Sequence, residues 1–293
     1  MPSGRIVVAG DVIDDIVVVP SVSIRPDTDT PSSIRFRAGG SAANTAAWLG
    51  TVGADVDFVG IVGESDIARH AELLSRWGVR PHLAISDRPT GTIIVLVDGE
   101  QRAMLTERGA NAVFDPATIN DDLLQGSRAL LLTGHSLSGQ TTAASLRALI
   151  TRARDLDVAV VVSPGSAGHI ADAGVQTFLQ AFAGATVLLP SLEEAQVLTG
   201  LDAPDAAAAA LAEFTPLVVL TNGGHEILVA QGSSIDRVAV TRSEVVDPTG
   251  AGDAFAAGFL AHWVRFNDPV GAAHAGAKLA AKSLAIVGGR PLA

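Results

Sequence analysis

Cysteine and tyrosine are absent from this 293-residue chain, and lysine occurs only twice, at Lys278 and Lys282. The lack of cysteine excludes disulfide frameworks, thiolate metal sites and cysteine nucleophiles. The formal net charge is −11, which argues against a partner that is a nucleic acid or a membrane surface, because both require a basic patch. The seven histidines show no metal-ligand spacing, so we expect no transition-metal site.

Long apolar runs are also missing. No stretch reaches the ~18 residues of a membrane span, and residues 1–5 lead into a strand without a signal-peptide core, so we expect a cytoplasmic protein. Apolar residues nevertheless make up 48% of the chain and charged residues 17%. Such a composition builds a large core, in one large α/β domain or two small ones.

Short β-branched runs alternate with alanine-rich stretches of helical spacing, a pattern typical of a mostly parallel sheet covered by helices on both faces. The predicted strands are residues 6–9, 56–59, 129–132, 158–162, 187–189, 217–220 and 227–230. The predicted helices are residues 41–52, 65–77, 139–155, 191–199, 203–213, 250–266 and 269–285. The last of these begins with Asp268 as N-cap and Pro269 at the first helical position.

Two segments interrupt this alternation. Residues 14–37 hold two β-branched runs joined by a polar link, and residues 92–106 form a predicted hairpin around Asp98-Gly99. Apolar and polar residues partly alternate in these segments, as in a small sheet with one solvent-exposed face. We therefore expect them to lie apart from the main sheet.

The most informative segment is Asp247-Pro-Thr-Gly-Ala-Gly-Asp253. Its glycine-rich turn Gly250-Ala251-Gly252 opens a helix, whose unpaired N–H groups carry the positive end of the helix dipole and suit phosphate. Asp253 then lies in the first turn, where a carboxylate would repel a phosphate. That placement favours a base that removes a proton from a nucleophile attacking the phosphate.

The sequence from Asp247 to Leu260, DPTGAGDAFAAGFL, resembles the C-terminal signature of the ribokinase family, also called the PfkB carbohydrate kinases. The segment from Gly39 to Asn44 is similar to that family's N-terminal di-glycine signature. Further motifs follow in the family's order, namely Thr90-Gly91-Thr92, Gly109-Ala110-Asn111, Glu194-Ala195 and Thr221-Asn222-Gly223. The resemblance covers about residues 5–289, and an ordered set is far more specific than one glycine motif.

The resemblance implies one kinase domain over residues 1–293, with a three-layer α/β/α fold, a mostly parallel sheet and a small β lid. It implies ATP and Mg²⁺ as cofactors, K⁺ as a further candidate, and a small sugar as the acceptor. Asp253 would be the catalytic base, and Gly250, Ala251 and Gly252 the anion hole. The lid, residues 14–37 and 92–106, would also form a homodimer contact.

On the substrate side, the resemblance assigns sugar contacts to Asp15, Gly39, Gly40, Asn44 and His135. Asp15 lies five residues after the glycine that ends the first strand, and Asn44 offers both a donor and an acceptor to hydroxyls. The neighbouring carboxylates Asp11 and Asp14 are expected to be turn and cap residues.

On the nucleotide side, the implied contacts are Thr221, Gly223, Ser191, Glu194 and Lys278. Glu194 would organise Mg²⁺ through water, but Ser191 stands where the family has asparagine, so weaker magnesium binding is expected. Glu226 replaces a family glycine and would reshape the triphosphate loop.

The resemblance gives Asp247 and Thr249 as ligands of a monovalent cation. Because the printed chain stops at Ala293, we expect a more open adenine pocket, with residues 278–289 as its wall.

Several other functions stay open at this point. A nucleoside kinase of the same family needs an apolar or aromatic wall for the base, and the aromatic residues near the lid are Phe36, Trp48 and Phe114. A keto-deoxy sugar acid kinase needs an arginine such as Arg102 or Arg108. A catalytically silent nucleotide-binding regulator would have no use for a base at position 253, and no Gly-x-Gly-x-x-Gly of a dehydrogenase follows the first strand.

Overall fold

A large sheet runs through the molecule in the order β13-β12-β11-β10-β9-β8-β1-β4-β5, in a computed structural model that describes residues 4–98, 101–241 and 244–292. The strands are β1 (Arg5–Ala9), β4 (Val56–Gly63), β5 (Arg80–Ser86), β8 (Ser127–Thr133), β9 (Ala159–Ser163), β10 (Val187–Leu188), β11 (Leu217–Asn222), β12 (Glu226–Gln231) and β13 (Ser234–Ala239). All neighbours from β11 to β5 pair in parallel, and β12 and β13 add an antiparallel edge.

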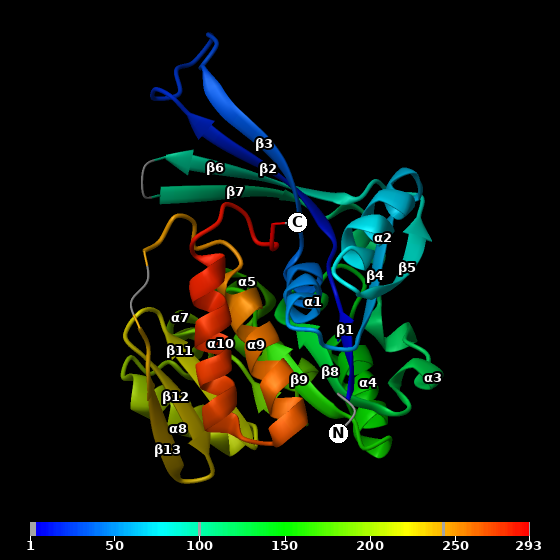
Figure 1. Cartoon of the computed structure of the whole chain (residues 1–293), viewed down its shortest axis with the longest axis vertical. Helices are drawn as coiled ribbons and strands as arrows, with labels where there is room; N and C mark the ends of the chain where they lie inside the picture. Colours follow the sequence, from blue (N-terminus) through cyan, green and yellow to red (C-terminus); the bar gives the residue numbers. More distant parts are fainter. Residues whose placement is uncertain (1–3, 99–100, 242–243, 293) are drawn as a thin grey trace.

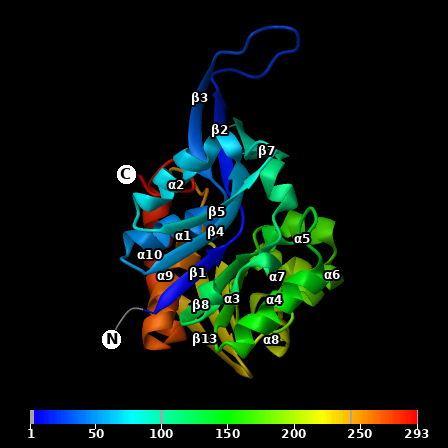
Figure 2. The ribbon, with the colours of Figure 1, turned by 90° about the vertical axis from the view of Figure 1, so that its right-hand side faces the viewer.

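Helices cover both faces of this sheet (Figure 2). One face carries α1 (Ser41–Thr51), α2 (Ile67–Ser75), α9 (Ala251–Phe266) and α10 (Pro269–Ser283). The other carries α3 (Asp121–Leu124), α4 (Ala143–Asp155), α5 (Ala167–Ala173), α6 (Val175–Ala181), α7 (Leu192–Thr199) and α8 (Pro204–Phe214). Successive residues of β1 pack into the cores on opposite faces of the sheet. Val8 packs in the core under α1, α9 and α10, and Val7 packs in the core on the other face. The expected three-layer α/β/α architecture is confirmed.

A second sheet, which we call the lid, projects from one end of the molecule (Figure 1). It consists of β2 (Ile13–Pro20), β3 (Ser32–Gly39), β6 (Gly91–Asp98) and β7 (Gln101–Glu107), in the order β3-β2-β6-β7. The segments 14–37 and 92–106 therefore supply its strands. The turn predicted at Asp98-Gly99 extends beyond the described residues, since residue 99 is not among them.

Two strands escaped the sequence analysis, β5 and β13, and both are edge strands of the main sheet. Most residues of these two strands are exposed or half-buried. The strands therefore lack the continuous apolar run of a strand that is buried on both faces. Helix α10 begins as predicted, because Asp268 Oδ1 accepts the N–H of Gly271 at 3.0 Å and Pro269 follows it. Among the described residues, no helix combines the length and apolarity that crossing a membrane requires.

Candidate active site

The turn before α9 fixes the position of Asp253. Gly250 has φ 78°, in the left-handed region that favours glycine. A Cβ atom at this position would lie 2.5 Å from the Cα of Gly289, so a side chain does not fit. This tight turn places Asp253 in the first turn of a sixteen-residue helix, whose apolar side is buried and holds the carboxylate in one place.

Asp253 accepts two hydrogen bonds from α1. The Ser41 hydroxyl donates to Oδ1 at 2.6 Å, and the Asn44 amide donates to Oδ2 at 3.0 Å. Burial raises the pKa of Asp253 to about 7, and the nearby Asp11 and Asp15 carboxylates add to this, although the two hydrogen bonds oppose it. A carboxylate with such a pKa can take up a proton near neutral pH.

The backbone N–H groups around Asp253 are partly free. The N–H of Ala251 contacts the carbonyl oxygen of Pro248 at 3.3 Å. Those of Gly252 and Asp253 meet no acceptor within the described part of the chain, as expected at the start of a helix. Space is open beside Gly252, where a Cβ atom would have no neighbour within 4 Å. Of the predicted anion hole, Gly252 is the best-placed donor.

A cavity of about 500 Å³ opens next to Gly252. Its walls are Thr221, Gly223, Gly224, His225, Ile227, Val240, Thr241, Val245, Pro248, Ala251, Gly252, Phe255, Ala277, Ala280, Ala281 and Leu284. None of these described lining residues is Asp, Glu, Lys or Arg, so backbone N–H groups face any anion there. The sequence prediction included Thr221, Gly223 and a wall over residues 278–289, to which Ala280, Ala281 and Leu284 belong. It did not include Ile227 of β12 or Ala277 of α10.

Ser191 and Glu194 form a capping box at the start of α7. The Ser191 N–H donates to Glu194 Oε2 at 2.8 Å, and the Glu194 N–H donates to the Ser191 hydroxyl at 3.2 Å. A bridge between Ser191 and Thr221 puts this pair at the margin of the cavity. Burial raises the pKa of Glu194. Lys278 is exposed on α10 and does not line the cavity, so the structure gives its predicted role no support.

Asp15 lies on β2 and is buried on the same face of the lid as Val17. A Cβ atom at Gly39 would come within 2.2 Å of its Oδ2, so glycine is required where β3 passes this carboxylate. Burial raises the pKa of Asp15 to about 7; Arg290 opposes this, and Asp11 and Asp14 reinforce it. The Asp15 carboxylate is also one of the charges that raise the pKa of the half-buried Asp253.

Asp11 is a cap, as predicted: its carboxylate accepts the N–H groups of Ser41 at 2.9 Å and Ala42 at 3.2 Å. It thereby holds the start of α1, and with it Gly40, Ser41 and Asn44, against the end of β1. Its Oδ1 also lies 3.4 Å from the Thr133 hydroxyl at the end of β8.

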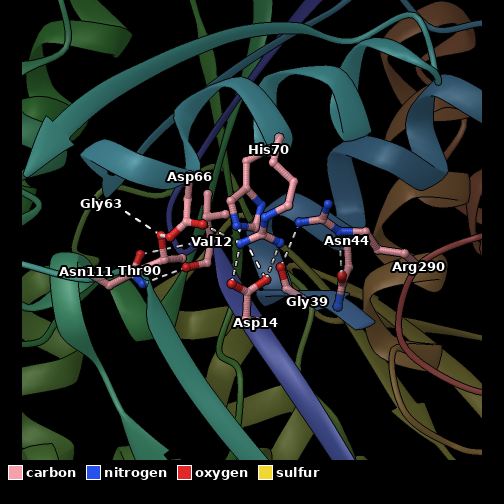
Figure 3. A network of polar contacts seen from close by, with 11 residues as sticks. Val12, Asp14, Gly39, Asn44, Gly63, Asp66, His70, Thr90, Asn111 and Arg290 are labelled. Atoms are coloured by element: carbon pink, nitrogen blue, oxygen red, sulfur yellow. Dashed lines mark hydrogen bonds and ion pairs between the residues drawn. The ribbon is translucent and has the colours of Figure 1, made fainter. Parts of the chain in front are cut away.

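Asp14 is not a turn residue but part of β2, and it anchors the lid to α2 (Figure 3). Arg69 donates to its carboxylate at 2.8 Å and also contacts Asp66 at 2.9 Å. Asp66 in turn accepts from the Thr90 hydroxyl, just before β6. Burial would raise the pKa of Asp14, but the nearby His70 ring, 3.5 Å away, and the hydrogen bonds from Arg69 hold it well below its usual range.

His135 follows β8 in a short 3₁₀ turn, with its ring 4.9 Å from that of His169. Burial lowers the pKa of His135, so the imidazole is held in the neutral form. Asp11 is among the charges that act on it, which places His135 at the same end of the sheet as the carboxylates.

Asp247 ties the turn before α9 to the C-terminal segment. Its oxygens accept the N–H groups of Thr249 at 2.8 Å and Gly288 at 3.0 Å. The next residue, Gly289, accepts from the Trp48 indole at 2.9 Å. The cation role of Asp247 and Thr249 stays a prediction.

Arg290 is the site residue that sequence reasoning missed. It is only 9% exposed; its Nε donates to Asn44 Oδ1 at 3.3 Å, and its Nη2 donates to the Gly39 carbonyl at 2.7 Å (Figure 3). No motif marks it, because its partners lie about 250 positions away in the chain.

Comparison with known proteins shows the family of the chain. The family model described as pfkB family carbohydrate kinase matches residues 3–291. A bifunctional protein HldE of Gluconobacter oxydans is 31% identical over 87% of this chain and 55% of its own length. An ATP-dependent ribose-1-phosphate kinase of Halopiger xanaduensis is 30% identical over 90% of this chain and 86% of its own. The chain spans about half the length of the HldE relatives it matches.

Solved structures show the same fold at low sequence identity. Adenosine kinase from Sinorhizobium meliloti has a TM-score of 0.89 and 22% identity, covering 99% of this chain and 97% of its own. Ribokinase from Thermotoga maritima has a TM-score of 0.82 and 22% identity, covering 98% and 94%. With the family match over nearly the whole length, the chain belongs to the pfkB family of carbohydrate kinases.

Proposed function

We propose that this protein is an ATP-dependent kinase that phosphorylates a primary hydroxyl of a small sugar or sugar derivative. The observation that carries the proposal is the position of Asp253. Its carboxylate is fixed by Ser41 and Asn44, and it directly follows Gly252, which lines the 500 Å³ cavity. A base and an anion-binding turn thus meet at one point, as phosphoryl transfer to an alcohol requires.

In the proposed reaction, Asp253 accepts the proton of the sugar hydroxyl as its oxygen attacks the γ-phosphorus of ATP. A new O–P bond forms, the bond from the γ-phosphorus to the bridging oxygen breaks, and ADP leaves with that oxygen. The N–H groups of Gly252 and Asp253 stabilise charge on the transferring phosphoryl group. Asp15 and Asn44 hold the other hydroxyls, with Gly39, Gly40 and His135 as further walls of the sugar site.

In this proposal the nucleotide occupies the cavity between β12 and α10, whose apolar walls include Val240, Val245 and Phe255 and whose lining includes Gly252. The apolar walls would receive the base, and the phosphates would lie toward Gly252. Mg²⁺, when bound with the nucleotide, would supply positive charge that the described walls lack. Glu194 is the candidate to orient the ion through water, because its capping box with Ser191 lies at the margin of the cavity. We also propose that Asp247 and Thr249 help to bind a monovalent cation such as K⁺.

A nucleoside is the second candidate substrate. The positions of three aromatic side chains favour a sugar over it. Phe36 is 73% exposed; it pairs with Ile16 on the lid face opposite to Asp15, so it cannot wall the substrate. The Trp48 indole is committed to Gly289, and Phe114 packs in a separate cluster with Ile61. No aromatic platform for a base remains among these residues.

A sugar that carries a carboxylate or phosphate is a further candidate substrate. Arg108 contacts the Ser138 hydroxyl at 3.3 Å and so lies near His135, whose carbonyl oxygen accepts from that hydroxyl. It is the candidate to receive a carboxylate or phosphate on the substrate. The side chain of Arg102 lies outside the described residues. The relative from Halopiger xanaduensis, named for ribose 1-phosphate, makes sugar phosphates worth testing.

The outer face of the lid is proposed as a homodimer contact. Strand register puts Ile34, Phe36 and Leu105 on this face, and they are 56%, 73% and 61% exposed. A contiguous apolar sheet face of this kind is unusual on a monomer.

The experiment is a phosphorylation screen of the purified chain with ATP and Mg²⁺. Pentoses, hexoses, sugar phosphates, keto-deoxy acids and nucleosides are offered separately, and ADP release is recorded. The proposal expects turnover on a sugar or sugar derivative, abolished in the Asp253→Asn control. Turnover on nucleosides alone, or on none of these acceptors, would contradict it.

A further inference from the structure

Arg290 is buried beside the base of the lid, although nothing in the proposed reaction uses it. It reaches two acceptors that sequence analysis had placed in the sugar site, the carbonyl of Gly39 and the amide oxygen of Asn44 (Figure 3). We propose that Arg290 is a positioning residue, which fixes the Asn44 side chain so that its NH₂ group faces the catalytic base Asp253. This inference rests on the proposed function of Asp253.

The chemistry of the three side chains permits only one orientation of the amide. Arginine has donors and no acceptor, so it can bond only the oxygen of Asn44. An ionised Asp253 has acceptors and no donor, so it can bond only the nitrogen. The structure shows both contacts, Nε to Oδ1 at 3.3 Å and Nδ2 to Oδ2 at 3.0 Å. Arg290 therefore selects the amide orientation that supports a base ready to accept a proton.

The backbone around Arg290 is anchored on both sides of the active-site turn. Gly288 donates to Asp247, and Gly289 accepts from Trp48. A Cβ atom at Gly289 would lie 2.4 Å from Nδ2 of Asn44, so this segment packs directly on the amide. The anchored main chain at Gly288 and Gly289 therefore fixes the position from which the Arg290 guanidinium reaches Asn44.

Arg290 keeps its positive charge although it is buried. Burial lowers the pKa of Arg290 to about 10, while Asp15, Asp14 and Asp11 oppose the decrease and Arg69 adds to it. Arg290 therefore stays positive at neutral pH. Its Nη1 is buried without a hydrogen-bond partner among the described residues. Attraction to the neighbouring carboxylates offsets only part of the cost of burial, since the pKa of Arg290 is lowered.

The test compares Arg290→Met, Arg290→Lys and Asn44→Ala with the double variant Asn44→Ala/Arg290→Met. Arg290 and Arg76 both line a cavity of about 220 Å³. Arg76→Met is the matched control, because the guanidinium of Arg76 bonds, among the described residues, only the exposed Glu72. We expect Arg290→Met to lower kcat by on the order of 10- to 100-fold, the scale of a misplaced reacting group. The KM for ATP should stay unchanged, and Arg290→Lys should recover part of the loss by keeping one donor.

The double variant should be no slower than Asn44→Ala, because Arg290 acts through that amide. Additive losses would overturn the inference, as would an Arg290→Met enzyme with normal kcat. A spectroscopic readout needs no substrate: the side-chain NH₂ signals that disappear in Asn44→Ala should shift in both Arg290 variants and stay in place in Arg76→Met. If Arg290→Met does not fold, the Asn44 NH₂ signals are compared between the wild type and Arg290→Lys. Unchanged signals in Arg290→Lys would refute the contact between Arg290 and Asn44.

The two hypotheses can fail separately. If Asp253→Asn is inactive while both Arg290 variants turn over normally, the inference about Arg290 is wrong and the proposed function stands. If Asp253→Asn remains active, the proposed base is wrong whatever Arg290 does.

Discussion

Replacing Ser41 with alanine removes the hydroxyl that donates to Asp253 at 2.6 Å and leaves the backbone of α1 in place. A hydrogen bond to a charged group contributes about 1.5–3 kcal/mol, and one pKa unit corresponds to about 1.4 kcal/mol. Loss of this bond disfavours the ionised form, so the pKa of Asp253 should increase by about one to two units above its value of about 7. About half of Asp253 is ionised at pH 7 when its pKa is about 7. Because the base acts when ionised, an increase of one to two units should lower activity at pH 7 by roughly 5- to 50-fold.

The assay is the pH profile of kcat/KM for the sugar from about pH 5 to pH 9, which reports the ionisations of the free enzyme. The wild-type profile should decrease below about pH 7, and the Ser41→Ala profile should shift to higher pH and recover in alkali. Thr45→Val is the control, since Thr45 is buried on the same helix and its hydroxyl donates to the Ser41 carbonyl, not to Asp253. An equal loss at every pH, with no shift, would refute the assigned role of the hydroxyl.

Three further predictions concern the substrate, the lid and stability. Asp15→Ala should raise KM for the sugar by on the order of 10- to 100-fold, since bonds to a charged partner are lost, and isothermal titration should show ATP binding unchanged; equal weakening of ATP would place Asp15 elsewhere. Phe36→Asp should convert a dimer into a monomer in sedimentation, because it puts a charge on the exposed lid face; an unchanged mass at all concentrations would remove the proposed interface. Trp48→Phe should lower the free energy of unfolding by about 1–3 kcal/mol, because the buried Gly289 carbonyl loses its donor; an unaltered denaturant midpoint would show that this anchor contributes nothing.

Much of the site could be predicted because its geometry is local. The turn at Gly250 and the carboxylate of Asp253 are neighbours in sequence, and a glycine turn followed by a helix fixes how they lie. Continuous apolar strands such as β9 were equally clear, since they are buried on both faces.

The rest depends on contacts between distant parts of the chain. Arg290 meets Gly39 and Asn44 across about 250 positions, and Ser41 meets Asp253 across 212. No period or motif encodes such contacts. The exposed position of Lys278 likewise follows from how α10 is rotated against the sheet, so the cavity is lined by Ala277 and Ala281 instead.

The central claim is that Asp253 is the base of the phosphoryl transfer, and Asp253→Asn tests it most directly. Asparagine keeps the size of the side chain but cannot accept a proton at neutral pH. We expect the variant to fold and to bind ATP as the wild type does, with kcat on the identified sugar lower by about 10²- to 10⁴-fold, the range for losing a general base. Near-normal turnover on that sugar would contradict the mechanism.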